Sequence, residues 1–218
     1  MKLGDVFPNF EADSTVGKLK WNDWQGDSWA ILFSHPRDFT PVCTTELGQV
    51  VQKEPEFKKR GVKLIAISCD SVEDHKAWSK DVMSYCGANG TALPYPILAD
   101  PDRSLAKQLG MIDPDETTET GMPLTARAVF IVGPDHKLKL SILYPATTGR
   151  NFNEILRVVD SLQLTAKQSV ATPVDWQPGK PAMVVPTLSA DEAKSKFPNH
   201  EVRSVPSGKS YLRFTPDY

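Results

Sequence analysis

Strand-like and helix-like segments alternate between residues 29 and 164, and this alternation limits the possible folds more than any other feature. The strand-like runs are largely apolar, whereas the segments between them repeat apolar residues at helical spacing. Such alternation predicts an α/β fold, with a central sheet flanked by helices on both faces. We expect strands at 29–34, 62–68, 126–132 and 138–144, a short apolar segment at 97–98, and helices at 44–60, 73–85, 102–110 and 151–164.

Local signals mark the ends of several of these elements. Gly61 follows the helix predicted at 44–60, Gly110 closes the one at 102–110, and Asp70 or Ser71 can cap the helix at 73–85. Residues 133–136, Gly-Pro-Asp-His, predict a hairpin-like turn between the last two strands.

The composition and the apolar pattern of the chain change beyond Ala166. Seven of its 18 prolines lie between Pro173 and Pro216, and apolar periodicity there is weak. A few large apolar residues, such as Trp176, still indicate an ordered segment. We therefore predict two domains, 1–166 and 167–218, of which the second has too little core to fold alone.

Composition excludes several classes of function. The net charge of -2 gives no reason to expect a nucleic-acid partner. No apolar stretch approaches the roughly 20 residues of a transmembrane helix, and the first residues do not resemble a targeting signal, so we expect a cytoplasmic protein. The three cysteines form no CxxC pair, which argues against a thioredoxin-type redox motif and a zinc site, and their odd, small number argues against a disulfide framework. No metal or cofactor is expected.

Cys43 lies just beyond the first predicted strand, at the first turn of the following helix. Unpaired N–H groups and the helix dipole at that place favour a thiolate, the nucleophilic form of cysteine. The alternative is a buried structural thiol, and position alone does not decide between them.

Pro36 and Thr40 precede Cys43 in the spacing Pro-x-x-x-Thr-x-x-Cys. The Thr40 hydroxyl can meet the sulfur across one turn or bind a peroxide oxygen, and Pro36 can wall a pocket without offering an N–H group. Alternatively, Thr40 is a helix-start hydroxyl and Pro36 only ends a strand.

Residues 35–46, His-Pro-Arg-Asp-Phe-Thr-Pro-Val-Cys-Thr-Thr-Glu, resemble the active-site signature of the peroxiredoxins. Residues 33–36, 145–151, 171–176 and 211–213 resemble the 1-Cys branch, so the resemblance covers essentially the whole chain. It implies a thioredoxin-like fold with a small C-terminal extension that contributes to a homodimer.

The resemblance also implies an activity: a thiol peroxidase that reduces hydrogen peroxide and organic hydroperoxides, phospholipid hydroperoxides among them. Cys43 would be oxidised to a sulfenic acid. Because no cysteine follows Cys86, we expect recycling by an external reductant such as glutathione, delivered by a glutathione transferase, or ascorbate. Thioredoxin is expected to work poorly.

Arg127 interrupts an otherwise apolar strand, and a buried charge is costly unless it meets an anion. Glu46 is a candidate structural partner. The favoured interpretation places Arg127 against the Cys43 thiolate, as the family resemblance implies. Arg150 either assists from the loop before the last helix or is an ordinary surface or capping charge, and His35 either hydrogen-bonds near the sulfur or is structural.

Residues 26–30, Gly-Asp-Ser-Trp-Ala, resemble a lipase-like segment of certain 1-Cys peroxiredoxins. An alternative function is therefore a phospholipase-type acyl hydrolase with Ser28 as its nucleophile. Asp135 matches the proposed aspartate, but Asn22 stands where the histidine base is proposed, and asparagine cannot accept a proton near neutral pH. We therefore expect at most a minor hydrolase activity. The other alternative is a peroxide sensor or a redox-regulated chaperone. Repeated turnover of peroxide with an added reductant would distinguish the enzyme from either of these.

Overall fold

The structure, a computed structural model, describes residues 1–218. It contains two compact units, Met1–Phe152 and Asn153–Tyr218. Helix α5 (Phe152–Lys167) therefore belongs almost entirely to the second unit, whereas the predicted domain boundary lies at its end. None of the helices combines the length and the apolar character that crossing a membrane requires.

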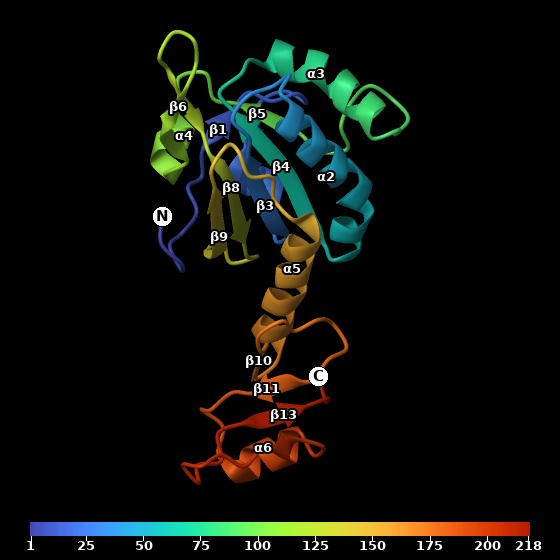
Figure 1. The fold of residues 1–218 in the computed structure, drawn as a ribbon, viewed down its shortest axis with the longest axis vertical. Coiled ribbons are helices and arrows are strands. Elements are labelled where there is room, and N and C mark those ends of the chain that lie inside the picture. Colours follow the sequence, from blue (N-terminus) through green and yellow to red (C-terminus); the bar gives the residue numbers. More distant parts are fainter. The chain divides into compact units, whose positions relative to one another are not determined.

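The first unit is built on a mixed five-stranded sheet in the order β5-β4-β3-β8-β9 (Figure 1). Strands β3, β4 and β5 are parallel, and β8 and β9 follow in antiparallel pairing. These strands span Trp29–Ser34 (β3), Val62–Ser68 (β4), Ile97–Ala99 (β5), Arg127–Val132 (β8) and Leu138–Tyr144 (β9), which confirms the predicted α/β sheet.

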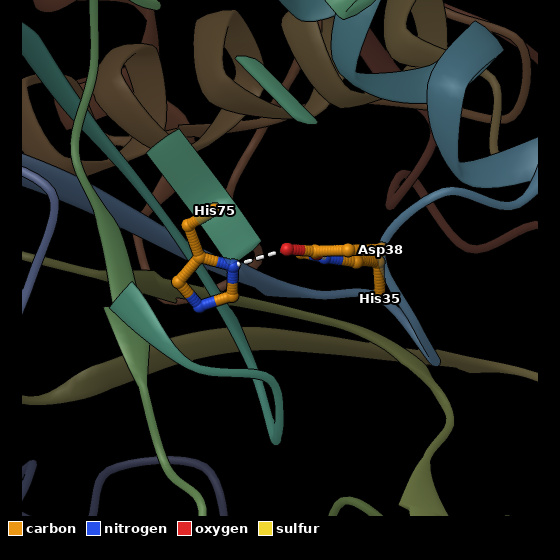
Figure 2. A group of neighbouring side chains, drawn as sticks. All are labelled: His35, Asp38 and His75. Carbon is orange, nitrogen blue, oxygen red and sulfur yellow. Dashed lines mark hydrogen bonds and ion pairs between the residues drawn. The ribbon is translucent and has the colours of Figure 1, made fainter. Parts of the chain in front are cut away.

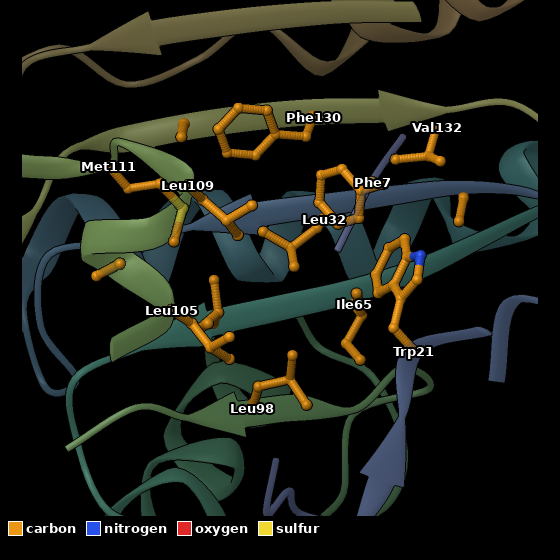
Figure 3. Packing of buried hydrophobic residues seen from close by; sticks show 14 of the residues in the cluster. Phe7, Trp21, Leu32, Ile65, Leu98, Leu105, Leu109, Met111, Phe130 and Val132 are labelled. Atoms are coloured by element: carbon orange, nitrogen blue, oxygen red, sulfur yellow. The ribbon is translucent and has the colours of Figure 1, made fainter. Parts of the chain in front are cut away.

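Helices cover both faces of this sheet because successive strand residues point to opposite sides. Leu32 lies in one buried cluster with Leu105 and Leu109 of helix α4 (Ser104–Leu109), as Figure 3 shows. Phe33 points to the other side and contacts the ring of Tyr95, whose hydroxyl donates to a carbonyl of helix α2 (Pro41–Lys59). Helix α3 (Val72–Tyr85) packs beside α2, and its N-cap is Ser71, one of the two predicted candidates.

Several short elements have no counterpart in the predicted pattern. They are β1 (Glu11–Ala12), β2 (Leu19–Lys20), α1 (Trp21–Gln25), and the antiparallel pair β6 (Ile112–Thr117) and β7 (Pro123–Thr125). Runs of two to six residues carry too little periodicity to be recognised from sequence.

The second unit contains an antiparallel sheet in the order β10-β11-β13-β12. Its small core joins Val170, Ala182 and Val184 of this sheet to Ala193 and Phe197 at helix α6. The elements are β10 (Val170–Ala171), β11 (Ala182–Val184), α6 (Ala190–Lys196), β12 (Glu201–Val202) and β13 (Arg213–Thr215).

Candidate active site

Cys43 occupies the third position of α2 and is completely buried. The helix begins at Pro41, three residues earlier than predicted, because proline is favoured at the first helical position, where no N–H donor is needed. The first helical bond runs from the N–H of Thr44 to the carbonyl of Thr40. The backbone N–H of Cys43 is therefore one of the unpaired donors at the positive end of the helix.

The loop that carries residues 35–40 into α2 is held on both sides. The backbone N–H of His35 donates to Ile67 O, and its carbonyl accepts from the Thr125 hydroxyl at 2.7 Å. The N–H of Asp38 donates to the Asp70 carboxylate at 2.9 Å. These bonds hold Phe39 in a left-handed conformation (φ 56°), which is strained for an aromatic residue.

Arg127, at the start of β8, joins the sulfur to a buried carboxylate. Its Nη1 donates to Cys43 Sγ at 3.3 Å and to Glu46 Oε2 at 2.7 Å. Its Nε and Nη2 both donate to the carbonyl of Ala146, which fixes the plane of the guanidinium. Arg127 thus contacts Glu46, its candidate structural partner, and the Cys43 sulfur together.

Arg150 completes the cluster and is buried, so it is not a surface or capping charge. Its Nε and Nη2 hold the two oxygens of Glu46 at 2.9 and 2.7 Å, and its backbone N–H donates to the same carboxylate. Burial opposes ionisation of Glu46, but the bonds and charge of Arg150, followed by the charge of Arg127, hold its pKa below the ordinary value. Two cations and one anion leave one net positive charge, which a Cys43 thiolate would balance.

Thr40 is the residue before helix α2 begins, and its hydroxyl does not bond to the sulfur. Its hydroxyl donates to the carbonyl of Arg37 at 2.8 Å, which leaves the oxygen free to accept from a peroxide. Pro36 is buried at the end of β3, consistent with a wall without an N–H donor.

His35 belongs to a second buried cluster that the sequence analysis missed. Its Nε2 lies 2.6 Å from one oxygen of Asp38, and Nδ1 of His75 lies 2.6 Å from the other (Figure 2). Burial opposes ionisation of Asp38, but the bonds from both imidazoles outweigh it and lower its pKa to about 2. A signal existed in the sequence: the carboxyl ends of adjacent parallel strands lead into His35 and Asp38 on one side and toward His75 on the other.

His35, Asp38 and His75 are also the one group of side chains whose ligand atoms are close enough to hold a metal ion, all within 4.8 Å of one another. Two ligand atoms bound to one zinc ion are about 3.4 Å apart, given bonds of about 2.1 Å in a tetrahedron. The two contacts of 2.6 Å are hydrogen-bond distances instead. The geometry fits shared protons better than a metal.

The other two cysteines lie in different surroundings. Cys69 is buried, and burial raises its pKa to about 11, so it remains a thiol near neutral pH. Cys86 is half-buried, and its sulfur lies 3.5 Å from the carbonyl of Met83. All three cysteines are free.

The Ser28 segment does not form a hydrolase site in the structure. The Ser28 hydroxyl makes no hydrogen bond to Asp135 or to a histidine, and Asp135 is instead bonded to Lys139 at 2.6 Å. A nucleophilic serine needs a base within hydrogen-bond reach, and none is present.

Comparisons with known proteins agree with this geometry. The family model described as "AhpC/TSA family" matches residues 3–141, and the "C-terminal domain of 1-Cys peroxiredoxin" matches residues 161–200. The chain is a 1-Cys peroxiredoxin. It is 66% identical to peroxiredoxin-6 of Rattus norvegicus and 64% identical to that of Homo sapiens, each over 98% of this chain and 96% of the relative.

Two solved peroxiredoxin structures are similar over nearly the whole chain. A cysteine-to-serine mutant of peroxiredoxin 6 of Arenicola marina is 71% identical, with a TM-score of 0.98, and covers 100% of this chain and 99% of its own. A yeast mitochondrial 1-Cys peroxiredoxin, whose thiol is resolved via glutathione/thioredoxin systems, is 43% identical, with a TM-score of 0.89 and 99% of each chain covered. This peroxiredoxin therefore has a thioredoxin-like α/β fold with a C-terminal domain, and it is a thiol peroxidase with an antioxidant function. The comparisons do not favour the sensor, chaperone or hydrolase alternatives.

Proposed function

We propose that Cys43 is the residue that attacks the peroxide and that hydrogen peroxide and organic hydroperoxides, phospholipid hydroperoxides among them, are its substrates. The observation that carries this proposal is the contact of 3.3 Å between Arg127 Nη1 and Cys43 Sγ, inside a buried cluster with one net positive charge. A Cys43 thiolate balances this positive charge, whereas an uncharged thiol does not, so the cluster favours the thiolate.

The reaction then follows from the positions of the groups. The sulfur donates an electron pair to the terminal peroxide oxygen, the O–O bond breaks, and the other oxygen takes a proton and leaves as water or an alcohol. Cys43 becomes a sulfenic acid. Thr40 accepts a hydrogen bond from the bound peroxide, and Arg127 stabilises the negative charge that moves from sulfur to oxygen.

An external thiol restores Cys43 in this proposal. One glutathione condenses with the sulfenic acid to a mixed disulfide and water, and a second glutathione releases the reduced enzyme and glutathione disulfide. A glutathione transferase delivers the first thiol, and ascorbate is the alternative reductant. The yeast relative is resolved via glutathione/thioredoxin systems, so an assay with each reductant alone tests the expectation that thioredoxin works poorly.

Cysteine-to-serine variants test the proposed function. Cys43→Ser is expected to abolish peroxide reduction, since an alkoxide is inaccessible near neutral pH. Cys69→Ser and Cys86→Ser are matched controls and are expected to keep most of the activity. Peroxide consumption with an added thiol is the measurement, and activity retained by a folded Cys43→Ser variant would refute the proposal.

A further inference from the structure

A cavity of about 320 Å³ lies in the second unit, between the loop before α6 and the chain that leads into β13. The carbonyls of residues 185–189 lie against the side chain of Arg213 at the start of β13, which brings the two segments together. The polar wall includes Lys209, Ser210, Tyr211 and Arg213, and the apolar wall includes Leu188 and Val202. A hollow of this size, with a few polar groups beside an apolar wall, is typical of a small-ligand site.

Arg213 is a cation of this wall that no carboxylate neutralises, and it is only 6% exposed. Its Nη1 donates to the carbonyls of Leu188 and Ser189 at 2.9 and 3.3 Å, and its Nη2 donates to that of Val185 at 2.7 Å. Its Nε is buried without a partner. Carbonyl oxygens accept these hydrogen bonds but do not cancel the charge, and a buried cation without an anion is costly. An anion at this wall would compensate that charge.

The other polar groups of the wall can also donate. The Lys209 ammonium and the hydroxyls of Ser210 and Tyr211 form no hydrogen bond or ion pair within the chain, and all three residues are exposed. His200 also lines the cavity, and its Nδ1 contacts the carbonyl of Phe197. No acidic side chain lines the cavity, so its wall is suited to a negatively charged ligand.

The carboxylates of the surrounding elements are engaged elsewhere. Glu192 of α6 accepts from the backbone N–H of Ser189 at 2.8 Å. Asp217, after β13, accepts two hydrogen bonds from Asn199 at 2.9 Å. Glu201 is exposed on β12, and it alternates in direction with the next residue, which lines the cavity. These acids therefore leave the positive charge of the wall uncompensated.

We propose that this cavity binds a small organic anion, a carboxylate or a phosphate ester. Its charged group contacts Lys209 and Arg213, since both side chains bind such anions. The Tyr211 hydroxyl donates to a further oxygen of the ligand, and the apolar part of the ligand packs on Leu188. The site lies within the second unit and takes no part in the attack by Cys43, so it goes beyond the proposed function.

NMR titration of the full-length protein tests the proposal. The probes are phenyl phosphate and benzoate, which are anions, and benzyl alcohol, a neutral molecule of similar size. The anions are expected to shift the amide signals of residues 209–213 and the Nε–H signal of Arg213, with saturation at millimolar concentration or below. Benzyl alcohol should cause no saturable shift. The anion with the higher affinity identifies the charged group that the site prefers.

Two results of the titration would overturn the proposal outright: no saturable shift with either anion, or equal affinity for benzyl alcohol. Inorganic phosphate is a further probe, and we expect it to bind more weakly than phenyl phosphate because it has no apolar part. Equal affinity for the two would overturn the assignment to an organic anion.

Lys209→Gln is expected to weaken binding of the preferred anion about tenfold, because it removes a charged donor from the wall. Lys180→Gln, at an exposed lysine of the same unit outside the cavity wall, is the matched control and should leave the affinity unchanged. Arg213 is not replaced, because its bonds to three carbonyls also hold the loop before α6. Equal affinities of folded Lys209→Gln and Lys180→Gln would overturn the proposal.

Discussion

Arg127 combines three contacts that no other cation could make together. Its planar guanidinium touches the sulfur of Cys43, the carboxylate of Glu46 and the carbonyl of Ala146 at once. A lysine ammonium is a point donor on a flexible stem and cannot span these three acceptors. We therefore expect the reaction to depend on the planar geometry of the Arg127 guanidinium more than on its charge.

Arg127→Lys is predicted to slow peroxide reduction about 100-fold, the scale of losing one well-placed donor to developing charge. Stopped-flow measurement of Cys43 oxidation gives the rate. Arg60→Lys, at the far end of α2, is the control and should stay within twofold. If Arg127→Lys, equally folded, also stays within twofold, the arginine has only a structural role.

Cys69 is predicted to resist alkylation at pH 8, because burial raises its pKa to about 11 and leaves almost no thiolate. Iodoacetamide labelling followed by peptide mass measurement checks this, with half-buried Cys86 as the internal comparison. Labelling of Cys69 as fast as that of Cys86 in the folded protein would contradict the account.

The sequence predicted part of this site and missed part of it. The spacing Pro-x-x-x-Thr-x-x-Cys and the charge in an apolar strand led to Cys43 and Arg127. Arg150 stayed ambiguous because the bend that turns it back onto Glu46 has no periodic signal. Asp38 and His75 were missed because 37 residues separate them in sequence and only the parallel pairing of β3 and β4 brings them together.

Helix α2 is the element that organises the site. It carries Cys43 and Glu46 on adjacent turns of one buried face, and Glu46 ties the helix to β8 through Arg127 and to the loop before α5 through Arg150. One carboxylate thus fixes three segments of the chain around the sulfur.

Glu46→Gln is predicted to lower the free energy of unfolding by about 3 kcal/mol, because it leaves two buried guanidinium groups without an anion. Urea denaturation measures the change. Glu56→Gln is the matched control on the same helix, since Glu56 forms exposed pairs with Lys59 and Arg60, and little change is expected. Equal effects of the two substitutions would contradict the role given to Glu46.

The lowered pKa of Glu46 adds a dependence on pH to this comparison. A carboxylate whose pKa falls on folding stabilises the folded state fully above its ordinary value, 4.5, and loses that contribution as pH falls below it. The difference between the parent and Glu46→Gln should therefore shrink below pH 4.5. A difference independent of pH would show that the ion pairs are not its source.

The long elements were predictable and the short ones were not. Strands β3, β4 and β8 carry largely apolar runs, β9 alternates apolar and polar residues over its first half, and α3 and α5 repeat apolar residues at helical spacing. The start of α2 lies at Pro41 and not at the predicted Thr44, because proline fits the first helical position. Strand β6 is rich in acidic residues, and β7 has only three residues, so neither shows a clear alternation.

At the scale of the whole molecule, β9 is one edge of the five-stranded sheet, and only its first residue, Leu138, is hydrogen-bonded to the N-terminal segment. An exposed edge invites pairing with another strand, and Leu143 on this strand is 62% exposed. We propose a homodimer that pairs β9 across a two-fold axis.

The dimer predicts a mass near twice the 24.1 kDa of one chain in light scattering at micromolar concentration. Leu143→Glu should shift the protein toward monomer, because it brings two like charges, one from each β9 strand, close together at the paired edge. Val16→Glu, at an apolar residue that is 68% exposed elsewhere in the first unit, is the control. A clean monomer mass for the parent protein would rule out the dimer.

Mass measurement of the cysteine peptides after one equivalent of hydrogen peroxide tests the central claim most directly. The account predicts one added oxygen on Cys43, trapped as a sulfenic acid adduct, with Cys69 and Cys86 unchanged and no intramolecular disulfide. Excess peroxide should carry Cys43 on to the sulfinic and sulfonic acids. A quantitative bridge from Cys43 to Cys69 or Cys86, or an unmodified Cys43, would contradict it.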